Sequence, residues 1–137
     1  MSDDIIKLWL PWPPSLNHGY KIYKGRKVLS QETKKYKLDI GWEAKKFKNK
    51  KLYTEQLNFV CYLFPPDNRK RDDDNYVKFL RDGLQGILYD DDNQIMHTDI
   101  YKGCKIFLGR VYIEISRFTA DMRYFEIERE ALKVFCN

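Results

Sequence analysis

Short runs of β-branched and aromatic residues near the start of the chain have the composition of β-strands. Residues 5–10 form the first run and stop at a group of prolines, which cannot donate to a sheet ladder. Residues 20–29 alternate aromatic and aliphatic side chains with lysines on either side of Gly25. We therefore expect one strand that ends in a stiff loop, followed by a small hairpin with Gly25 at its turn.

Three later segments also have strand patterns. Residues 57–64 carry mostly apolar side chains at both odd and even positions and end at two prolines, which predicts a strand that is apolar on both sides and central in its sheet. Residues 95–108 and 111–115 predict two further strands, joined near Gly109.

A helix is predicted to follow the hairpin. Ser30 is suited to its N-cap, because a serine hydroxyl can satisfy an amide that the first turn leaves without a partner. Apolar residues then recur at helical spacing through about residue 48, at Tyr36, Ile40, Ala44 and Phe47. The lysines between residues 34 and 51, interleaved with aromatic residues, form either a phosphate-tracking surface or an ordinary solvated face, and the sequence leaves both open.

A second helix is predicted from about residue 75. Its apolar stripe consists of Val77, Leu80, Leu84, Ile87 and Leu88. Gly83 and Gly86 weaken this helix and can bend it or end it early. Residues 118–136 predict a charged C-terminal helix whose apolar positions are only loosely periodic.

The alternation of strands and helices indicates a mixed α/β fold, with one sheet packed against two main helices. At 137 residues, without a repeat, a low-complexity tract or a linker, residues 1–137 are expected to form one domain. The net charge of +5 and the isoelectric point near 9.0 are typical of a protein with a polyanionic partner.

The compartment is expected to be a reducing cytoplasm. The three cysteines, Cys61, Cys104 and Cys136, are widely spaced and never form a C-x-x-C pair, which argues against a zinc ribbon and against a secreted disulfide scaffold. The N-terminus lacks a basic leader, and no apolar stretch approaches the ~20 residues that span a bilayer, so no membrane association is expected.

Two acidic runs carry the candidate chemistry. In the first, Asp72 and Asp74 are two residues apart, so on an extended segment their carboxylates point to one side and Asp73 to the other. Two such carboxylates can hold one Mg²⁺ that keeps its other positions for water and substrate phosphate. Lys78 lies four residues beyond Asp74 at a helix start, so its ammonium can reach the same phosphate.

Structural roles also account for part of these runs. Asp73 or Asp74 can cap the helix that follows, and the second run, residues 90–93, can form a turn. Neither run matches the glycine and glutamate spacing of a calcium loop. The only histidines, His18 and His97, lie in no zinc-hydrolase or acyl-transfer pattern. The combination of both acidic runs with flanking basic residues favours a metal site over capping alone.

The two acidic runs, together with motifs upstream of them, resemble those of the RusA-type Holliday junction resolvases of bacteria and their phages. Residues 71–78, R-D-D-D-N-Y-V-K, are similar to the family's R-D-x-D-N-x-x-K, and residues 89–95 resemble its D-D-x-Q-V. Upstream, residues 10–17 resemble the family's L-P-x-P-P-S-x-N, and residues 30–36 resemble its S-x-x-x-x-x-Y. The matches follow the family's order from about residue 5 to about residue 117.

The resemblance implies a small α/β homodimer that introduces paired symmetric nicks into four-way junction DNA during recombination and repair. It implies Mg²⁺ as the cofactor, with Mn²⁺ as a substitute. By similarity, the metal-binding and catalytic carboxylates are Asp72, Asp74 and Asp92, and Lys78 is the basic catalytic residue. Gln94 and Ile95 set the register that selects Asp92 over Asp91. The residues expected to contact DNA are Asn17, Arg69, Lys70, Arg71, Asn75 and Lys78.

The chain departs from the family pattern in three places. Asp73 occupies a position that is often apolar in relatives, and the loop at residues 18–20 differs in detail. Residues 118–137 extend beyond the core of about residues 5–117 and are expected to support the dimer or to regulate access. Two rival functions remain: a non-catalytic basic DNA-binding module, in which the carboxylates are caps and turns, and a general Mg²⁺-dependent nuclease.

Overall fold

The computed structural model describes residues 5–14, 20–47 and 54–136. Its centre is a four-stranded mixed sheet with the strand order β1-β6-β4-β5. The strands are β1 (Ile6–Pro11), β4 (Leu57–Phe64), β5 (Ile95–Lys102) and β6 (Arg110–Arg117). β6 is antiparallel to both β1 and β4, whereas β4 and β5 are parallel. The mixed α/β architecture expected from the sequence is therefore confirmed, and β4 lies inside the sheet as predicted.

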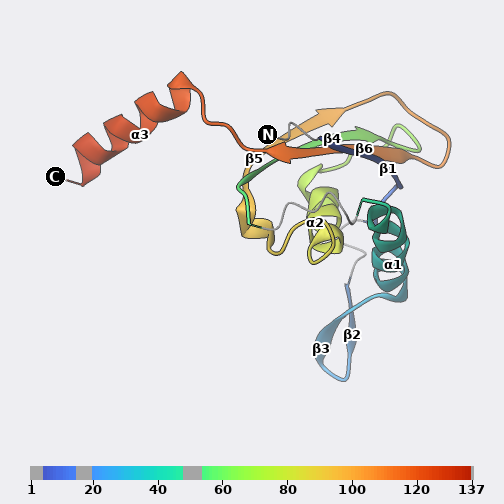
Figure 1. The fold of residues 1–137 in the computed structure, drawn as a ribbon. Helices are drawn as coiled ribbons and strands as arrows, with labels where there is room; N and C mark the ends of the chain where they lie inside the picture. Colours follow the sequence, from blue (N-terminus) through green and yellow to red (C-terminus); the bar gives the residue numbers. More distant parts are fainter. Residues whose placement is uncertain (1–4, 15–19, 48–53, 137) are drawn as a thin grey trace.

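One face of the sheet holds the core. Alternate side chains of β4 are buried, beginning with Leu57 and Phe59, and the alternate residues of β1 and β6 behave likewise. These side chains pack against apolar residues of two helices, α1 (Gln31–Lys45) and α2 (Asp74–Leu84), which lie on the same side of the sheet (Figure 1). Among the described residues, no helix covers the opposite face of the sheet (Figure 1).

α1 begins where the sequence predicts. The side chain of Ser30 accepts a hydrogen bond from the backbone N–H of Thr33 at 3.1 Å, which satisfies one of the free amides of the first turn. The buried hydroxyl of Tyr36 donates to the carbonyl of Pro11 at 2.8 Å and fixes the helix to the end of β1. α1 ends at Lys45, slightly before the predicted end near residue 48, which lies outside the described residues.

Gly83 has a packing role that the sequence did not indicate. A Cβ at this position would clash with the side chain of Ile40, so the glycine allows α2 to approach α1 closely. α2 nevertheless ends at Leu84, just after this contact, and Gly86 follows with φ of 84°. The predicted early end of the helix is therefore confirmed, and Leu88, expected on the helix, is buried in the turn beyond it.

β5 is shorter than predicted. It ends at Lys102 rather than near residue 108, and the segment 103–109 is a loop. A Cβ at Gly103 would clash with the ring of Phe64, while Leu108 and Gly109 both have positive φ values of 67° and 70°, which strand backbone does not allow. β5 and β6 are joined through this loop, but they do not pair with each other because β4 lies between them.

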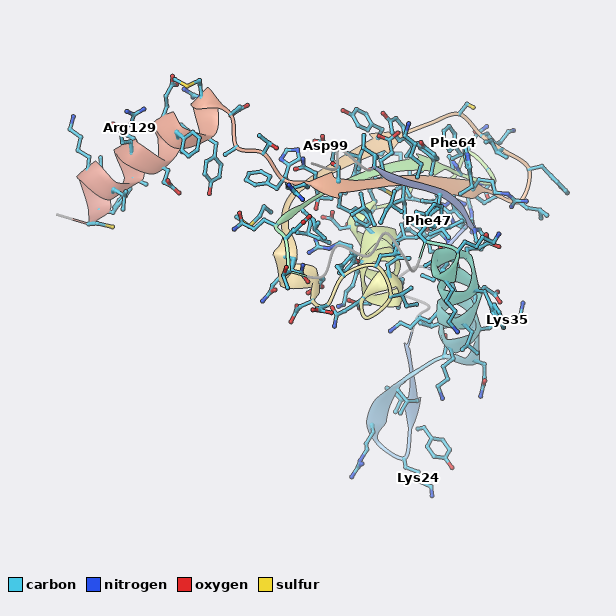
Figure 2. The ribbon with its side chains drawn as sticks, in the orientation of Figure 1. Lys24, Lys35, Phe47, Phe64, Asp99 and Arg129 are labelled. Carbon is cyan, nitrogen blue, oxygen red and sulfur yellow. The ribbon has the colours of Figure 1, made fainter. Side chains whose placement is uncertain are left out.

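Two elements project from the sheet and its helices (Figure 1). The hairpin of β2 (Tyr20–Tyr23) and β3 (Arg26–Leu29) forms as predicted, with Gly25 at φ of 76° in the turn and Lys24 at its tip (Figure 2). α3 (Met122–Phe135) is shorter than the predicted helix at 118–136, because Asp121 caps it by accepting from the N–H of Tyr124. Within the described ranges, no helix is both long and apolar enough to cross a membrane.

Candidate active site

The loop between β4 and α2 is held in place by Arg71. Its guanidinium binds the carboxylate of Asp67 at 2.7 Å, donates to the backbone carbonyls of Asp67 and Arg69 at 3.2 Å each, and lies over the ring of Trp12. Only 9% of the Arg71 side chain is exposed. Hydrogen bonds from the Arg69 backbone N–H, and then from the Arg71 side chain, lower the pKa of Asp67. Arg71 therefore anchors the segment that carries the first acidic run.

The first acidic run enters α2 through a helical turn rather than an extended segment. Asp73 has helical dihedrals, with φ of −59° and ψ of −35°, and Asp74 is the first residue of the helix. The side chain of Asp73 makes no capping hydrogen bond; instead, Asp72 Oδ1 accepts from the N–H of Asp74 at 3.2 Å. Asp72 and Asp74 are exposed whereas Asp73 is only partly so. The extended geometry predicted for this run is therefore wrong: a helical turn, not the pleat of a strand, leaves Asp73 less exposed than its two neighbours.

Asp73 points toward the sheet. Its carboxylate lies 3.9 Å from the ammonium of Lys102, on the inner face of β5, and its side chain is 25% exposed. Burial raises the pKa of Asp73, and the charges of Asp72 and Asp74 raise it further, while Lys102 acts in the opposite direction. Asp73 is thus placed between the acidic run and the edge strand.

The second acidic run forms the short 3-10 helix η3 (Asp92–Gln94). The side chain of Asp91 accepts from the N–H of Asn93, and the side chain of Gln94 accepts from the N–H groups of Asp90 and Asp91, which is a capping box. Gln94 also donates to the carbonyl of Glu55. The turn expected for this run is confirmed, and Asp91 and Gln94 provide the framework that positions Asp92.

Two adjoining cavities lie between α2 and β5, and Asp74 lines both of them. The smaller, of about 510 Å³, brings Asp92 of the second acidic run together with Asp74 and Lys78 of α2. The larger, of about 970 Å³, contains Asp72 and Asp73 beside Lys102. Three of the four predicted catalytic residues therefore share one cavity, and Asp72 lies on the next.

Arg81 is a residue of the smaller cavity that the sequence reading missed. Its Nη2 donates to the backbone carbonyl of Asp92 at 3.3 Å, while its buried Nε has no hydrogen-bond partner among the described residues. Arg81 lies three residues after Lys78 and seven after Asp74, which places all three on one side of α2. That spacing was the signal in the sequence that could have identified it.

Besides sharing a cavity with Asp74 and Asp92, Lys78 forms an ion pair with Asp82. Its ammonium lies 3.0 Å from the carboxylate of Asp82, one turn further along α2, and half of its side chain is exposed. A pair this exposed contributes little to stability and exchanges readily with another anion. Lys78 is therefore held near the smaller cavity by a contact that an incoming phosphate can replace.

The residues predicted to contact DNA occupy different positions. Arg69, 80% exposed, and Lys70 line the larger cavity and are open to solvent, whereas Arg71 is largely enclosed. Asn75 is the second residue of α2. Asn17 lies outside the described residues, as do residues 18 and 19 of the divergent loop. The DNA contacts of these residues stay predictions.

The lysine-rich face of α1 also stays undecided between DNA binding and solvation. Lys45 lies over the ring of Trp42 at 5.0 Å, and Lys46 pairs with Glu43 at 2.8 Å. Within α1, the larger cavity is lined by Glu32 and not by a lysine.

The donor set of the smaller cavity fits a hard divalent cation. Asp74 and Asp92 supply two carboxylates, and Mg²⁺ typically uses one or two protein carboxylates and keeps water or phosphate oxygens in its other positions. In the part of the chain that the structure describes, no three acidic, histidine or cysteine side chains converge into a closed ligand cluster. The arrangement thus suits an open site that shares its metal with a substrate rather than a structural metal cage.

Comparisons with known proteins agree with this arrangement. The family model described as "Endodeoxyribonuclease RusA" matches residues 11–116, which include both cavities. The chain is 31% identical over 108 residues to the crossover junction endodeoxyribonuclease of Enterobacteria phage HK97, covering 78% of this chain and 90% of that protein. It is 32% identical over 110 residues to the crossover junction endodeoxyribonuclease RusA of Escherichia coli strain K12, covering 72% of this chain and 88% of that protein.

The family model spans more than half of the chain, and both relatives are matched over most of their own length. The matched region contains the acidic runs, Lys78 and the strands and helices that position them. The chain therefore belongs to the RusA family of endodeoxyribonucleases.

Proposed function

We propose that the chain is a divalent-metal-dependent endonuclease that resolves four-way DNA junctions, with Mg²⁺ as the physiological ion and Mn²⁺ as a substitute. The observation that carries this proposal is the meeting of Asp92 with Asp74 and Lys78 of α2 at one cavity. Family membership supplies the reaction class, the hydrolysis of DNA phosphodiesters. We expect the enzyme to act in the cytoplasm of a bacterium, whether the gene is cellular or carried by a phage.

In the proposed site, Asp74 and Asp92 would hold the metal, with Asp72 on the adjoining cavity. When bound, the ion supplies a Lewis acid and lowers the pKa of a bound water. Lys78 places a positive charge beside the phosphate and stabilises the charge that develops on its oxygens. Arg81 keeps the backbone of Asp92 at the cavity through its hydrogen bond to the carbonyl.

The exposed basic residues beside the larger cavity are suited to the DNA backbone. Arg69 and Lys70 lie next to the acidic run, where they can pair with phosphates on either side of the scissile bond. Arg71 supports these contacts by holding the loop against Asp67. We propose that binding depends on the shape and charge of the DNA rather than on base contacts in this region.

We further propose that the enzyme acts as a homodimer. A four-way junction has approximate two-fold symmetry, so a two-fold protein can place one active site on each of two opposed strands. Paired symmetric nicks then follow from the symmetry of the complex.

The decisive test is cleavage of a synthetic four-way junction with Mg²⁺, beside a linear duplex of the same sequence. We expect the junction to be cut and the duplex to be spared. Asp74→Asn should bind the junction but not cut it, whereas Asp90→Asn should cut as fast as the wild type, because Asp90 is exposed and lines neither cavity. If Asp74→Asn cuts as fast as the wild type, the assignment of the site is wrong.

The same assay separates the two rival functions. Equal cutting of junction and duplex would indicate a general nuclease. Binding that is indifferent to divalent metal, with no nicked product, would indicate a non-catalytic DNA-binding module. A supercoiled plasmid that extrudes a cruciform tests the dimer, because paired nicks within one binding event yield linear DNA, whereas independent nicks yield open circles first.

A further inference from the structure

α3 has an apolar face that the rest of the described chain leaves largely uncovered. At about 100° per residue, its apolar side chains fall on one half of the helix and most of its charged ones on the other. The apolar half consists of Tyr124, Phe125, Ile127, Ala131, Leu132, Val134 and Phe135, all of them exposed. Since an isolated helix of this length is marginal in water, α3 requires a surface to pack against.

The outer face of the sheet, away from α1 and α2, carries a row of aromatic residues. The strand register places Trp9 opposite Tyr112, Tyr112 opposite Tyr62, and Tyr62 opposite Tyr101, so the row crosses all four strands. Neighbouring rings are 4.9, 5.9 and 4.7 Å apart between centroids. Trp9 is 54% and Tyr101 48% exposed, and Phe64 extends the row beside Trp9.

Figure 2 shows Phe64 and Asp99 on this outer side and Arg129 of α3 well away from the sheet. An aromatic row that is partly exposed across a whole sheet face is characteristic of protein interaction sites.

The two apolar surfaces meet at one end. A cavity of about 330 Å³ is lined by Val60 and Ser116 of the outer sheet face and by Phe118 and Tyr124, where α3 begins. The rings of Phe118 and Tyr124 pack edge to face, 5.6 Å apart. A partner that covers one of the two surfaces is therefore in a position to cover the other.

We propose that α3 of one copy packs its apolar face on the outer sheet face of a second copy, and that the second copy returns the contact. This inference names the surfaces of the homodimer proposed above and rests on that proposal. One reciprocal contact buries both uncovered surfaces of both chains, which is the closed, self-complementary arrangement of a two-fold dimer. In the single chain, α3 extends away from its own sheet and does not cover that face (Figure 1).

The dimensions of the two surfaces agree. A 14-residue helix is about 21 Å long. Strands of eight residues, such as β4 and β6, are about 27 Å long, and four strands span about 14 Å between the outermost two. One helix can therefore lie along the outer face and cover the aromatic row.

The charges on this face favour a protein partner over DNA. The row next to the aromatic one places Lys7 opposite Glu114, Glu114 opposite Val60, and Val60 opposite Asp99. On the other side of the aromatic row, Arg110 lies opposite Pro11 and Phe64, so two carboxylates on this face balance two basic side chains. A face without an excess of positive charge gives DNA little electrostatic attraction, whereas α3 offers side chains of both signs along the edges of its apolar half.

Two matched substitutions in α3 test the contact. Leu132→Glu places a carboxylate on the apolar half, and Met122→Glu makes the same kind of change on the polar half, where Met122 is 71% exposed. By sedimentation equilibrium, we expect Leu132→Glu to raise the dimer dissociation constant about tenfold or more, as for one buried interface side chain, and Met122→Glu to leave it unchanged. Far-ultraviolet circular dichroism checks that each variant stays folded.

Amine crosslinking of the wild-type protein tests which sheet α3 covers. An equal mixture of ¹⁴N- and ¹⁵N-labelled chains, once exchanged, should give Lys7–Lys133 crosslinks that join peptides of unlike label. Crosslinks only between peptides of the same label would mean that α3 packs on its own sheet. That result, a monomeric wild type, or equal dissociation constants for the two variants would overturn the proposal.

Failure of this proposal is distinguishable from failure of the proposed function. Asp74→Asn is expected to dimerise as the wild type does and to lose cleavage, because Asp74 begins α2, which lies on the other side of the sheet from the proposed contact. A chain that cuts junctions while Leu132→Glu dimerises normally would keep the active site and remove only the assignment of α3.

Discussion

The guanidinium of Arg81 donates to the backbone carbonyl of Asp92 at 3.3 Å, which ties the last turn of α2 to the start of η3. α2 also carries Asp74 and Lys78, so this hydrogen bond connects these two residues of the proposed site with Asp92, the residue from η3. The hydroxyl of Tyr89 donates in turn to the carbonyl of Arg81, and Tyr89 is completely buried. The second acidic run is thus attached to α2 from two directions.

Replacing Arg81 with Met should lower the cleavage rate about ten- to hundredfold, the usual cost of losing a residue that orients a metal ligand. Junction affinity in Ca²⁺, measured by fluorescence anisotropy, should change little, because the lost contact is to the protein backbone. Asp90→Asn, at an exposed position outside both cavities, is the control and should cut normally. A loss of affinity equal to the loss of rate would instead make Arg81 a DNA-binding residue.

Asp73→Asn should stabilise the protein at neutral pH. Burial raises the pKa of Asp73, so the folded state disfavours its carboxylate, and this cost is present above the raised pKa and disappears as the group is protonated. The gain in the free energy of unfolding over the wild type should therefore shrink as pH falls from neutral toward 3.8, the ordinary value. Urea unfolding across this range measures it, with the exposed Asp90→Asn as a control that should show no such trend. A variant less stable than the wild type at pH 7 would show that the Lys102 contact outweighs burial.

Lys78→Gln should reduce cleavage on the order of a hundredfold, the typical cost of removing one charge-stabilising donor from an active site. Asp82→Asn removes an exposed ion pair that contributes less than about 1 kcal/mol to stability. It should leave the cleavage rate within about twofold of the wild type. Single-turnover cleavage of the junction distinguishes the two. If Asp82→Asn loses as much activity as Lys78→Gln, the ion pair rather than the lysine alone is required.

Thiol reactivity should divide the cysteines into two classes. Cys61 is buried in β4, and burial raises its pKa to about 12, so it carries almost no thiolate at neutral pH. Cys104 and Cys136 are exposed. A chromogenic disulfide reagent should therefore titrate two thiols in the native protein and the third only after denaturation. Rapid reaction of all three without denaturant would show that β4 opens readily.

Gly83→Ala should destabilise the protein by about 1 to 3 kcal/mol, because the added methyl group meets Ile40 across the contact of α1 and α2. Helix propensity alone predicts the opposite sign, since alanine is the better helix former. Ile40→Val in the same chain removes part of the obstruction, so the double variant should lose less than the sum of the single losses. Strict additivity in urea unfolding would show that the two side chains do not compete for space.

Local structure in this chain follows from local chemistry. The cap at Ser30, the hairpin turn at Gly25 and the buried strand at residues 57–64 were predictable, because each depends on a hydroxyl, a permissive backbone or an apolar run within a few residues. The candidate carboxylates Asp72, Asp74 and Asp92 were identifiable for a similar reason, since their spacing and flanking residues form recognisable motifs.

The sequence by itself determined which residues are available for chemistry, the order of the elements, and the resemblance to RusA-type resolvases. Only the tertiary structure decided that β5 pairs with β4 instead of β6, which brings Asp92 beside Asp74 and makes Arg81 part of the site. It also decided that Asp73 turns toward Lys102 and that α3 leaves the sheet uncovered. These outcomes depend on contacts between residues far apart in the chain, whose free energy comes from packing and charge in three dimensions rather than from local patterns.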